Sequence, residues 1–254
     1  MQRIACKVEY IGTSFAGYQV QPNGRTVQEE LERALTKLHR GTPVKVVASG
    51  RTDAGVHAVG QVIHFDSPMS IPEDRWPKAL NPLLPADIRI AASQHVTQSF
   101  HARFSTTGKQ YRYKVVTQED VFMRNRATYV PVSLNLEAMR EAAQLIVGTY
   151  DFSSFCAANT SVQDKVRTVT RCEIIQDGRE LEFILEGNGF LYNMVRIAVG
   201  TLLEVGTGKR SPADMEGIIA AEDRSAAGKT APADGLYLWS VTYAEPLFQQ
   251  GQNS

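Results

Sequence analysis

The stretch TVQEELERALTKL, residues 26–38, carries a clear helical pattern. Thr26 and Glu29 have the spacing of a capping box, which marks the beginning of a helix. Gly41 and Pro43 follow the stretch and are expected to stop the helix. Apolar side chains recur at helical spacing on one stripe: Val27, Leu31, Ala34, Leu35 and Leu38. The pattern predicts an amphipathic helix.

Strand patterns lie on both sides of this helix. Before it, residues 3–10 alternate apolar and polar side chains, as a half-buried strand does. After it come two strand patterns joined by the polar loop GRTDAGVHA, then a helical stretch and a last strand: residues 44–48, 59–65, 73–80 and 88–96. The resulting order, β-α-β-β-α-β, is the ferredoxin-like pattern.

The second part of the chain repeats this order. The predicted elements are a strand, a helix, two strands, two helices and a last strand, over residues 111–117, 136–147, 165–176, 181–187, 190–204, 211–220 and 236–243. We therefore expect an α+β fold of two ferredoxin-like halves, residues 1–105 and 106–254. The halves are expected to join their antiparallel sheets and to leave a central catalytic cleft between them.

Bulk composition limits the classes of function. Of 254 residues, 27 are Lys or Arg and 27 are Asp or Glu, so the formal net charge is zero. Zero net charge argues against a general polyanion binder but leaves room for a local basic cleft. Three cysteines without paired spacing, no signal peptide and no apolar run long enough to span a bilayer favour a cytoplasmic protein with no membrane partner.

Asp53 lies in the loop GRTDAGVHA, between the strands predicted over residues 44–48 and 59–65. Glycines at positions 50 and 55 allow a tight backbone path and leave space beside the carboxylate for a bulky ligand. The alternative is an ordinary turn aspartate that accepts hydrogen bonds from nearby amides. The loop alone does not separate these two interpretations.

Arg196 is the single charged residue between Glu186 and Glu204, within a strongly apolar helical segment. A guanidinium in such a segment is costly unless it is paired. No acid lies three or four positions away, so a partner is expected from elsewhere in the fold, and Asp53 is an attractive one. Such a partner would keep Asp53 ionised near neutrality. The alternative is a surface arginine whose stem covers apolar side chains.

The strand KQYRYK, residues 109–114, interleaves aromatic and cationic side chains. Tyr111 and Tyr113 share one face at strand spacing, and Arg112 and Lys114 share the other. This pattern suits unpaired nucleic acid, whose bases stack on rings and whose phosphates need cations. An amphipathic, half-buried strand explains it equally well. Arginines nearby in sequence can extend a basic lining: Arg103, Arg124 and Arg126.

Other catalytic classes lack their motifs. The segment GTGK, residues 206–209, lacks the serine or threonine and the first glycine of a phosphate loop, and no GxGxxG is present. No serine-hydrolase elbow occurs. The histidines show no metal-ligand spacing, so no metal is expected: His39, His57, His64, His95 and His101. We interpret His57 as structural.

Three motifs together resemble a known family. GRTDAGVHA, the strand with KQYRY, and NGFLYNMVR resemble, in order and separation, the core motifs of the bacterial tRNA pseudouridine synthase A family. The segment GYQVQPNGRTVQEELE also fits, and the resemblance covers nearly the whole chain. It implies an isomerase that converts uridine to pseudouridine at positions 38, 39 and 40 of the tRNA anticodon arm, as a homodimer and without metal or organic cofactor.

The resemblance also implies roles for four residues. Asp53 is the expected catalytic aspartate, Tyr111 the ring that stacks on the target uracil, and Arg196 the ion-pair partner of Asp53. Arg51 resembles the arginine that helps to displace the base. Whether Asp53 adds to C1′, adds to C6 or acts as a base at the ribose is left open.

Two other functions compete. A non-catalytic RNA-binding module of paired ferredoxin-like units accounts for the aromatic and cationic side chains, but not for the Asp53 loop and Arg196. An enzyme that transfers the glycosyl group of a free nucleoside gives Asp53 a role, but leaves the basic and aromatic strand without one.

Overall fold

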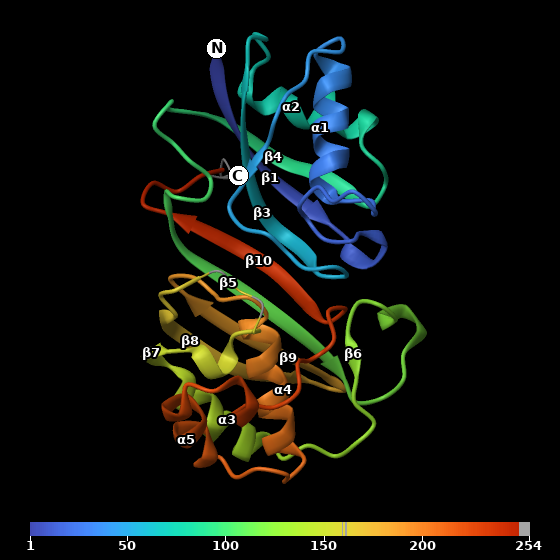
Figure 1. Cartoon of the computed structure of the whole chain (residues 1–254). Coiled ribbons are helices and arrows are strands. Elements are labelled where there is room, and N and C mark those ends of the chain that lie inside the picture. The colour runs from blue at the N-terminus through green and yellow to red at the C-terminus, as the bar shows by residue number, and fades with distance from the viewer. Residues whose placement is uncertain (159, 161, 249–254) are drawn as a thin grey trace, which may run out of the picture. The chain divides into compact units, whose positions relative to one another are not determined.

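The computed structural model describes residues 1–158, 160 and 162–248. The chain divides into two compact units. Unit 1 comprises Met1–Thr107 together with the described residues from Tyr237 onward, and unit 2 comprises Gly108–Leu236. Both contain helices and antiparallel strands, so the predicted α+β class is confirmed (Figure 1).

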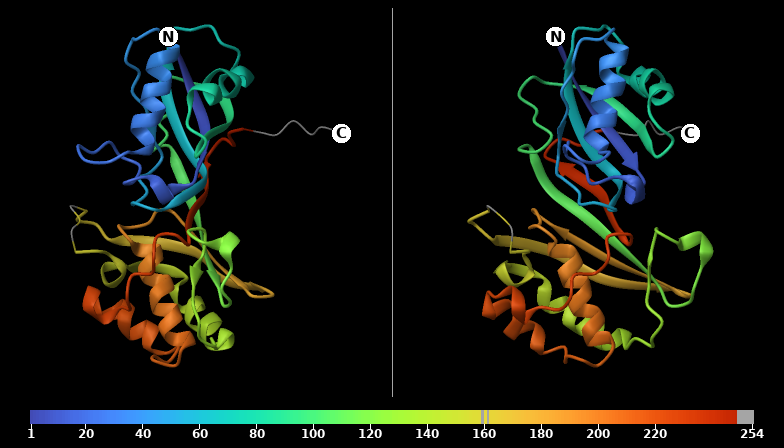
Figure 2. Two further views of the ribbon diagram at one scale, coloured as in Figure 1. Left: turned by 90° about the vertical axis from the view of Figure 1, so that its right-hand side faces the viewer. Right: turned by 45° about the vertical axis from the view of Figure 1, so that its right-hand side comes forward.

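Unit 1 has the predicted β-α-β-β-α-β order. Its elements are β1 (Gln2–Tyr10), α1 (Val27–Leu38), β2 (Val47–Ala48), β3 (His57–Ser67), α2 (Trp76–Leu80) and β4 (Ile88–Val96). β1 lies between β3 and β4 and is antiparallel to both, as Figure 2 allows the reader to follow. β2 pairs with the other edge of β3, also antiparallel. α1 and α2 contact each other.

The helix α1 begins as the sequence predicts. The Thr26 side chain accepts a hydrogen bond from the Glu29 amide, at 3.3 Å. Its apolar stripe is buried together with side chains of the sheet and of α2, among them Val27, Leu31, Leu35, Ile4, Phe65 and Trp76. At about 25 cal/mol per Å² of apolar surface, this burial is the main stabilising contribution to unit 1.

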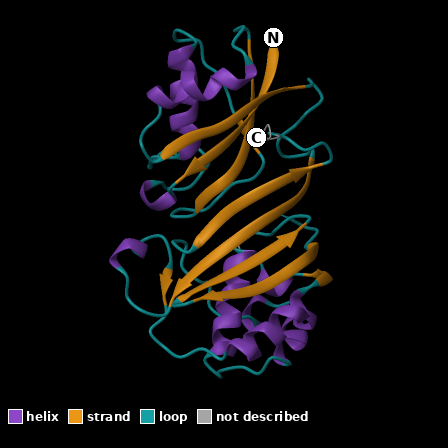
Figure 3. Ribbon diagram, turned by 180° about the vertical axis from the view of Figure 1, so that it is seen from behind, coloured by secondary structure: helices purple, strands orange, loops and turns teal. Residues whose placement is uncertain are grey.

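The elements of unit 2 are β5 (Thr106–Val116), β6 (Thr128–Tyr129), α3 (Leu136–Ile146), β7 (Gly148–Asp151), β8 (Val166–Asp177), β9 (Glu180–Gly187), α4 (Met194–Gly206) and α5 (Asp214–Ala221). The first two residues of β5 belong to unit 1. β5, β9, β8 and β7 pair in that order, each antiparallel to the next. β6 adds a short parallel pairing to β5. The three helices lie together on one face of this sheet (Figure 3).

The last strand, β10 (Leu236–Tyr243), begins at the end of unit 2 and continues in unit 1. There it pairs in parallel with β3, with Tyr237 opposite His57 and Leu238 opposite Ala58. The sequence analysis assigned all of residues 106–254 to the second half. The structure instead returns the chain to unit 1 at Tyr237, because these backbone pairings tie β10 to β3.

Several predicted elements differ in length from the observed ones; β5, for example, begins at Thr106 and not at residue 111. Two further differences are shortenings. The helix expected from residue 190 begins only at Met194, because Asn193 adopts a left-handed backbone conformation with φ of 60°. The strand expected over residues 44–48 is reduced to Val47–Ala48. Its ladder with β3 covers only two residue pairs. Local periodicity does not reveal either limit.

Candidate active site

The loop that carries Asp53 joins β2 to β3. Thr52 and Val56 are buried, Asp53 is half-buried and Ala54 is exposed. The Val56 amide donates to the Asp53 carbonyl at 3.1 Å, and Gly55 has a positive φ of 81°. The chain therefore makes a tight turn, with apolar and hydroxyl side chains buried on either side of Asp53.

The segment after β1 supports this loop from one side. The Tyr18 amide donates to the Thr52 carbonyl at 3.0 Å. The Gly12 amide donates to Nδ1 of His57, also at 3.0 Å. A Cβ atom at Gly12 would lie 2.0 Å from the Val56 carbonyl oxygen, so no other residue fits there without a shift of the backbone. The GxxxxxY spacing of residues 12–18 is thus matched to the loop that it contacts.

A buried polar network supports the loop from the sheet. The Tyr10 hydroxyl lies 2.8 Å from Oγ1 of Thr52. In β3, Gln61 accepts a hydrogen bond from the Ser49 hydroxyl at 2.6 Å and donates to the Gly50 carbonyl at 2.9 Å. Burial raises the pKa of Tyr10 to about 12, against the opposing hydrogen bonds of Thr52 and Gln61, so the phenol stays neutral. Asp53 therefore lies in a turn whose backbone is held on two sides.

Replacement of Gln61 by leucine is expected to lower the free energy of unfolding by about 1–3 kcal/mol, because the Ser49 hydroxyl and the Gly50 carbonyl lose a partner in a buried region. Urea titration of the purified variant measures the loss. Gln118→Leu, at an exposed position, is the matched control and should unfold as the wild type does. Equal stability of both variants would remove the network from the support of the loop.

Two histidines of unit 1 have structural contacts. His57 accepts from Gly12 and stacks on Tyr237, with ring centroids 4.6 Å apart and an interplanar angle of 22°. His64 is buried, and its Nδ1 accepts from the Ala102 amide at 3.1 Å. In each histidine Nδ1 is the acceptor and carries no proton, so both imidazoles are neutral in this arrangement. The contacts of His57 support its structural interpretation.

Stability is expected to fall as the pH is lowered through the range in which His64 titrates. Burial, and next the charges of Arg3 and His101, lower the pKa of His64 from 6.5 to about 4, while Asp66 opposes them. Between these values the unfolded chain binds the proton and the folded chain does not, so acid favours unfolding by up to about 3 kcal/mol. Urea unfolding at several pH values between about 7 and 4 measures this slope. His64→Asn, which keeps an acceptor, should flatten it, and an unchanged slope would contradict the assignment.

In unit 2, Tyr111 lies on β5 opposite Leu185 of β9. The residue is 9% exposed, and its ring packs nearly perpendicular to that of Phe190, with centroids 5.2 Å apart and an interplanar angle of 83°. Tyr113, two residues along, is fully buried and donates its hydroxyl to the Pro232 carbonyl at 2.9 Å. Both rings lie on the face predicted from strand spacing, but Tyr113 is committed to the core.

The cations of this strand are not all available for phosphates. Arg112 forms an ion pair with Glu182 of β9, at 2.9 Å, and its Nε donates to Gln110 at 3.1 Å. Glu182 is the residue that β5–β9 register places diagonally across the strand pair. The positive charge of Arg112 is therefore largely balanced inside unit 2.

Arg196 is the third residue of α4. Its Nε donates to the Ala231 carbonyl at 2.7 Å, and Nη1 donates to Oδ1 of Asn193 at 2.9 Å. The Ala231 amide in turn donates to the Arg196 carbonyl at 3.0 Å. These contacts fix the direction of the guanidinium from within unit 2. The Ala231 carbonyl is a neutral partner that the sequence did not indicate. The expected ion pair of Arg196 with Asp53 stays a prediction.

Burial raises the pKa of the Tyr113 phenol, and the positive charge of Arg196 is among the smaller influences that oppose this shift. Unit 2 thus brings Arg196 within electrostatic range of β5, the strand that also carries Tyr111. Asp53 and Arg51 belong to unit 1. Arg51 is exposed, and its side chain makes no hydrogen bond or ion pair with the described residues.

Sequence reasoning did not identify the supporting residues Tyr10, Ser49 and Gln61, nor Phe190 and Asn193 in unit 2. One signal was present for Gln61, since a neutral polar residue stands between apolar residues in the strand VGQVIHF. Such a residue in a buried strand needs hydrogen-bond partners inside the protein. Its partners are not visible in the sequence.

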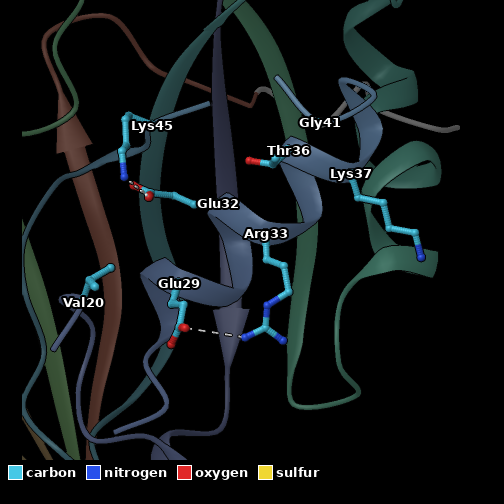
Figure 4. Close-up of a pocket in the computed structure, with 8 residues that line it drawn as sticks. All are labelled: Val20, Glu29, Glu32, Arg33, Thr36, Lys37, Gly41 and Lys45. Carbon is cyan, nitrogen blue, oxygen red and sulfur yellow. Dashed lines mark hydrogen bonds and ion pairs between the residues drawn. The ribbon is translucent and has the colours of Figure 1, made fainter. Parts of the chain in front are cut away.

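A surface groove along α1 is lined by Val20, Glu29, Glu32, Arg33, Thr36, Lys37, Gly41 and Lys45 (Figure 4). Its charges are largely paired with one another. Lys45 lies 2.7 Å from Glu32, and Arg33 lies 3.8 Å from Glu29 one turn earlier on the helix. This pairing is typical of a solvated helix face and gives no basis for a catalytic role.

Within the described ranges, no three histidine, cysteine, aspartate or glutamate side chains gather as ligands for a metal ion. No helix of the described chain combines the length and the apolar character needed to cross a membrane.

Comparison with known proteins points in one direction. A family model described as "tRNA pseudouridine synthase" matches residues 6–105 and 142–244. A protein named tRNA pseudouridine synthase A from Geobacillus kaustophilus is 57% identical over 246 residues, which cover 96% of this chain and 95% of that protein. Its namesake from Bacillus subtilis is 54% identical over 244 residues, covering 95% of this chain and 99% of that protein.

A solved structure titled "Crystal Structure of a Cbf5-Nop10-Gar1 Complex" aligns with 79% of this chain and 54% of that chain, at 12% identity and a TM-score of 0.33. This similarity is too low to support a conclusion.

Proposed function

Because the chain belongs to the tRNA pseudouridine synthase family, whose members are isomerases, we propose that it converts uridine to pseudouridine at positions 38, 39 and 40 of the tRNA anticodon arm. The observation that carries the proposal is the loop GRTDAGVHA, in which Asp53 lies half-buried in a turn held by Tyr10, Thr52 and Gln61. A preorganised carboxylate is what the reaction needs beside the ribose.

The reaction breaks the N1–C1′ bond of the uridine, turns the uracil and forms a C5–C1′ bond. The hydrogen leaves C5 and N1 gains one, so the product is an isomer and no redox partner is required. The chain's own residues therefore suffice for the chemistry that we propose, without a metal or an organic cofactor. The Asp53 carboxylate can serve by addition to C1′, by addition to C6 or as a base at the ribose.

The target base must leave its stack before Asp53 can reach it, which costs a few kcal/mol. We assign Tyr111 to stacking on the extracted uracil, which returns about 1–3 kcal/mol of this cost. Arg51, exposed in the same loop as Asp53, is assigned to displacement of the base. Arg196 is assigned to pairing with Asp53, which would favour its ionised form.

The partner of the enzyme is then tRNA, held at the anticodon stem-loop. We also propose that the protein is a homodimer and acts in the cytoplasm, because the family resemblance implies the dimer and the sequence favours a cytoplasmic protein.

A comparison of substrates tests the function. Purified protein is incubated with an unmodified tRNA transcript, with a transcript in which cytidine replaces uridine at positions 38 to 40, and with free uridine, and the products are digested and analysed for pseudouridine. Product from the first transcript alone supports the proposal. Product from free uridine favours a nucleoside enzyme, binding without product favours an RNA-binding module, and equal product from both transcripts refutes the positions.

A further inference from the structure

An ordered turn in unit 1, residues 101–106, presents a phenylalanine to solvent. Phe104 is 77% exposed, although an aromatic ring of this size contributes most to stability when it is buried. An exposed Phe ring gives up the stabilisation that burial would provide, so we expect a ligand that covers it.

The turn is built by hydrogen bonds that fix its backbone. Nδ1 of His101 accepts from the amides of Arg103 and Phe104, both at 3.2 Å. The Ser105 amide donates to the His101 carbonyl at 2.9 Å, and the Ser105 hydroxyl accepts from the His101 amide at 3.0 Å. Phe104 therefore stands at a defined position.

The turn is also anchored to the sheet of unit 1. Ala102 is fully buried, and its amide donates to His64 of β3 at 3.1 Å. Its carbonyl accepts from the Tyr243 hydroxyl at 2.8 Å and from the Thr106 hydroxyl at 2.9 Å. Ala102 thus links the turn to β3, β5 and β10 through three hydrogen bonds.

Two side chains flank the Phe104 ring. His101 stacks on it, with centroids 4.3 Å apart and an interplanar angle of 29°. The guanidinium of Arg103, which is itself exposed, lies 5.7 Å from the ring centroid. Aromatic rings offer stacking surfaces to unpaired bases, and a nearby cation suits the phosphate, so this arrangement is compatible with binding of single-stranded nucleic acid.

We propose that Phe104, with His101 and Arg103, is a binding surface for an unpaired base of the tRNA substrate. The surface lies outside the Asp53 loop and rests on the proposed function for the identity of the RNA. RNA is favoured over a protein partner because the turn exposes a single ring beside a cation. A protein interface commonly needs a contiguous apolar patch of several hundred Å².

Substitution of the ring tests the surface by tRNA affinity. Phe104→Leu should weaken binding of an unmodified tRNA transcript by about 5- to 150-fold, the range that loss of one base–aromatic stack gives. Phe104→Tyr keeps the ring and should bind as the wild type does. Phe122→Leu is the matched control, because Phe122 is 87% exposed and no ring or cation contact flanks it in the described chain. It should leave the affinity unchanged.

The salt dependence separates stacking from charge. Phe104→Leu should keep the slope of log Kd against log salt, while Arg103→Gln should reduce it by about 0.7, the contribution of one phosphate contact on single-stranded RNA. Binding to a fully paired RNA duplex should be equal for Phe104→Leu and the wild type. Wild-type affinity of Phe104→Leu for tRNA, or an equal loss on the duplex, would overturn the proposal.

A change of oligomeric state in Phe104→Leu, without a change in tRNA affinity, would also overturn it and indicate a second copy of the chain as the partner. None of these results depends on turnover, so failure of the surface is distinguishable from failure of the synthase assignment.

Discussion

Replacement of Asp53 by asparagine is expected to abolish pseudouridine formation and to leave tRNA binding intact. Asparagine has the size and shape of aspartate but no negative charge and little basicity or nucleophilicity. Loss of a group that transfers a proton costs about 10²- to 10⁴-fold in rate, and loss of a covalent nucleophile costs more. The fold should persist, because the neighbouring backbone bonds of the loop do not use the carboxylate.

Turnover is measured by pseudouridine formed per enzyme on an unmodified tRNA transcript, and binding by filter retention of the same RNA. Asp177→Asn is the matched control, since Asp177 is an exposed aspartate next to a turn that contains a glycine, away from the Asp53 loop. It should be fully active. Turnover of Asp53→Asn within tenfold of the wild type would remove Asp53 from the mechanism.

Substitution of Tyr111 is expected to separate the ring from the hydroxyl. Tyr111→Phe keeps the stacking surface and should retain tRNA binding and most of the turnover. Tyr111→Leu removes one base–aromatic stack, so activity should fall by about 5- to 150-fold or more. Single-turnover rates of pseudouridine formation measure both variants, and equal rates would count against a stacking role.

Tyr113→Phe provides the control on the same strand. Its hydroxyl donates to the Pro232 carbonyl and lies 2.6 Å from the Thr128 hydroxyl, inside the core. Loss of these bonds should lower the free energy of unfolding by about 1 kcal/mol and leave the rate of pseudouridine formation unchanged. Tyr111 and Tyr113 lie two residues apart on the same face of β5. Substitution of Tyr111 is thus expected to change the rate, and substitution of Tyr113 the stability.

Some residues of the candidate site could be identified from the sequence, and others only from the structure. Asp53, Tyr111 and Arg196 could be singled out because each stands in a distinctive local pattern. Gln61 could not be assigned a role, since its partners Ser49, Gly50 and Tyr10 lie up to 51 positions away in the chain. Likewise, the ion pair of Arg112 with Glu182 joins residues 70 positions apart and depends on strand register.

The sequence by itself determined the α+β class, the helix at residues 27–38, the order of the strands and helices apart from the short β6 and β7, and the motifs that mark the family. These features depend on side chains a few positions apart, so periodicity and spacing record them. The tertiary structure alone decided that β10 pairs with β3 and that α4 begins only after Asn193. It also decided that Tyr113 is buried with its hydroxyl hydrogen-bonded, and that Phe104 is exposed. Each of these depends on backbone register and packing between distant segments, which no local pattern contains.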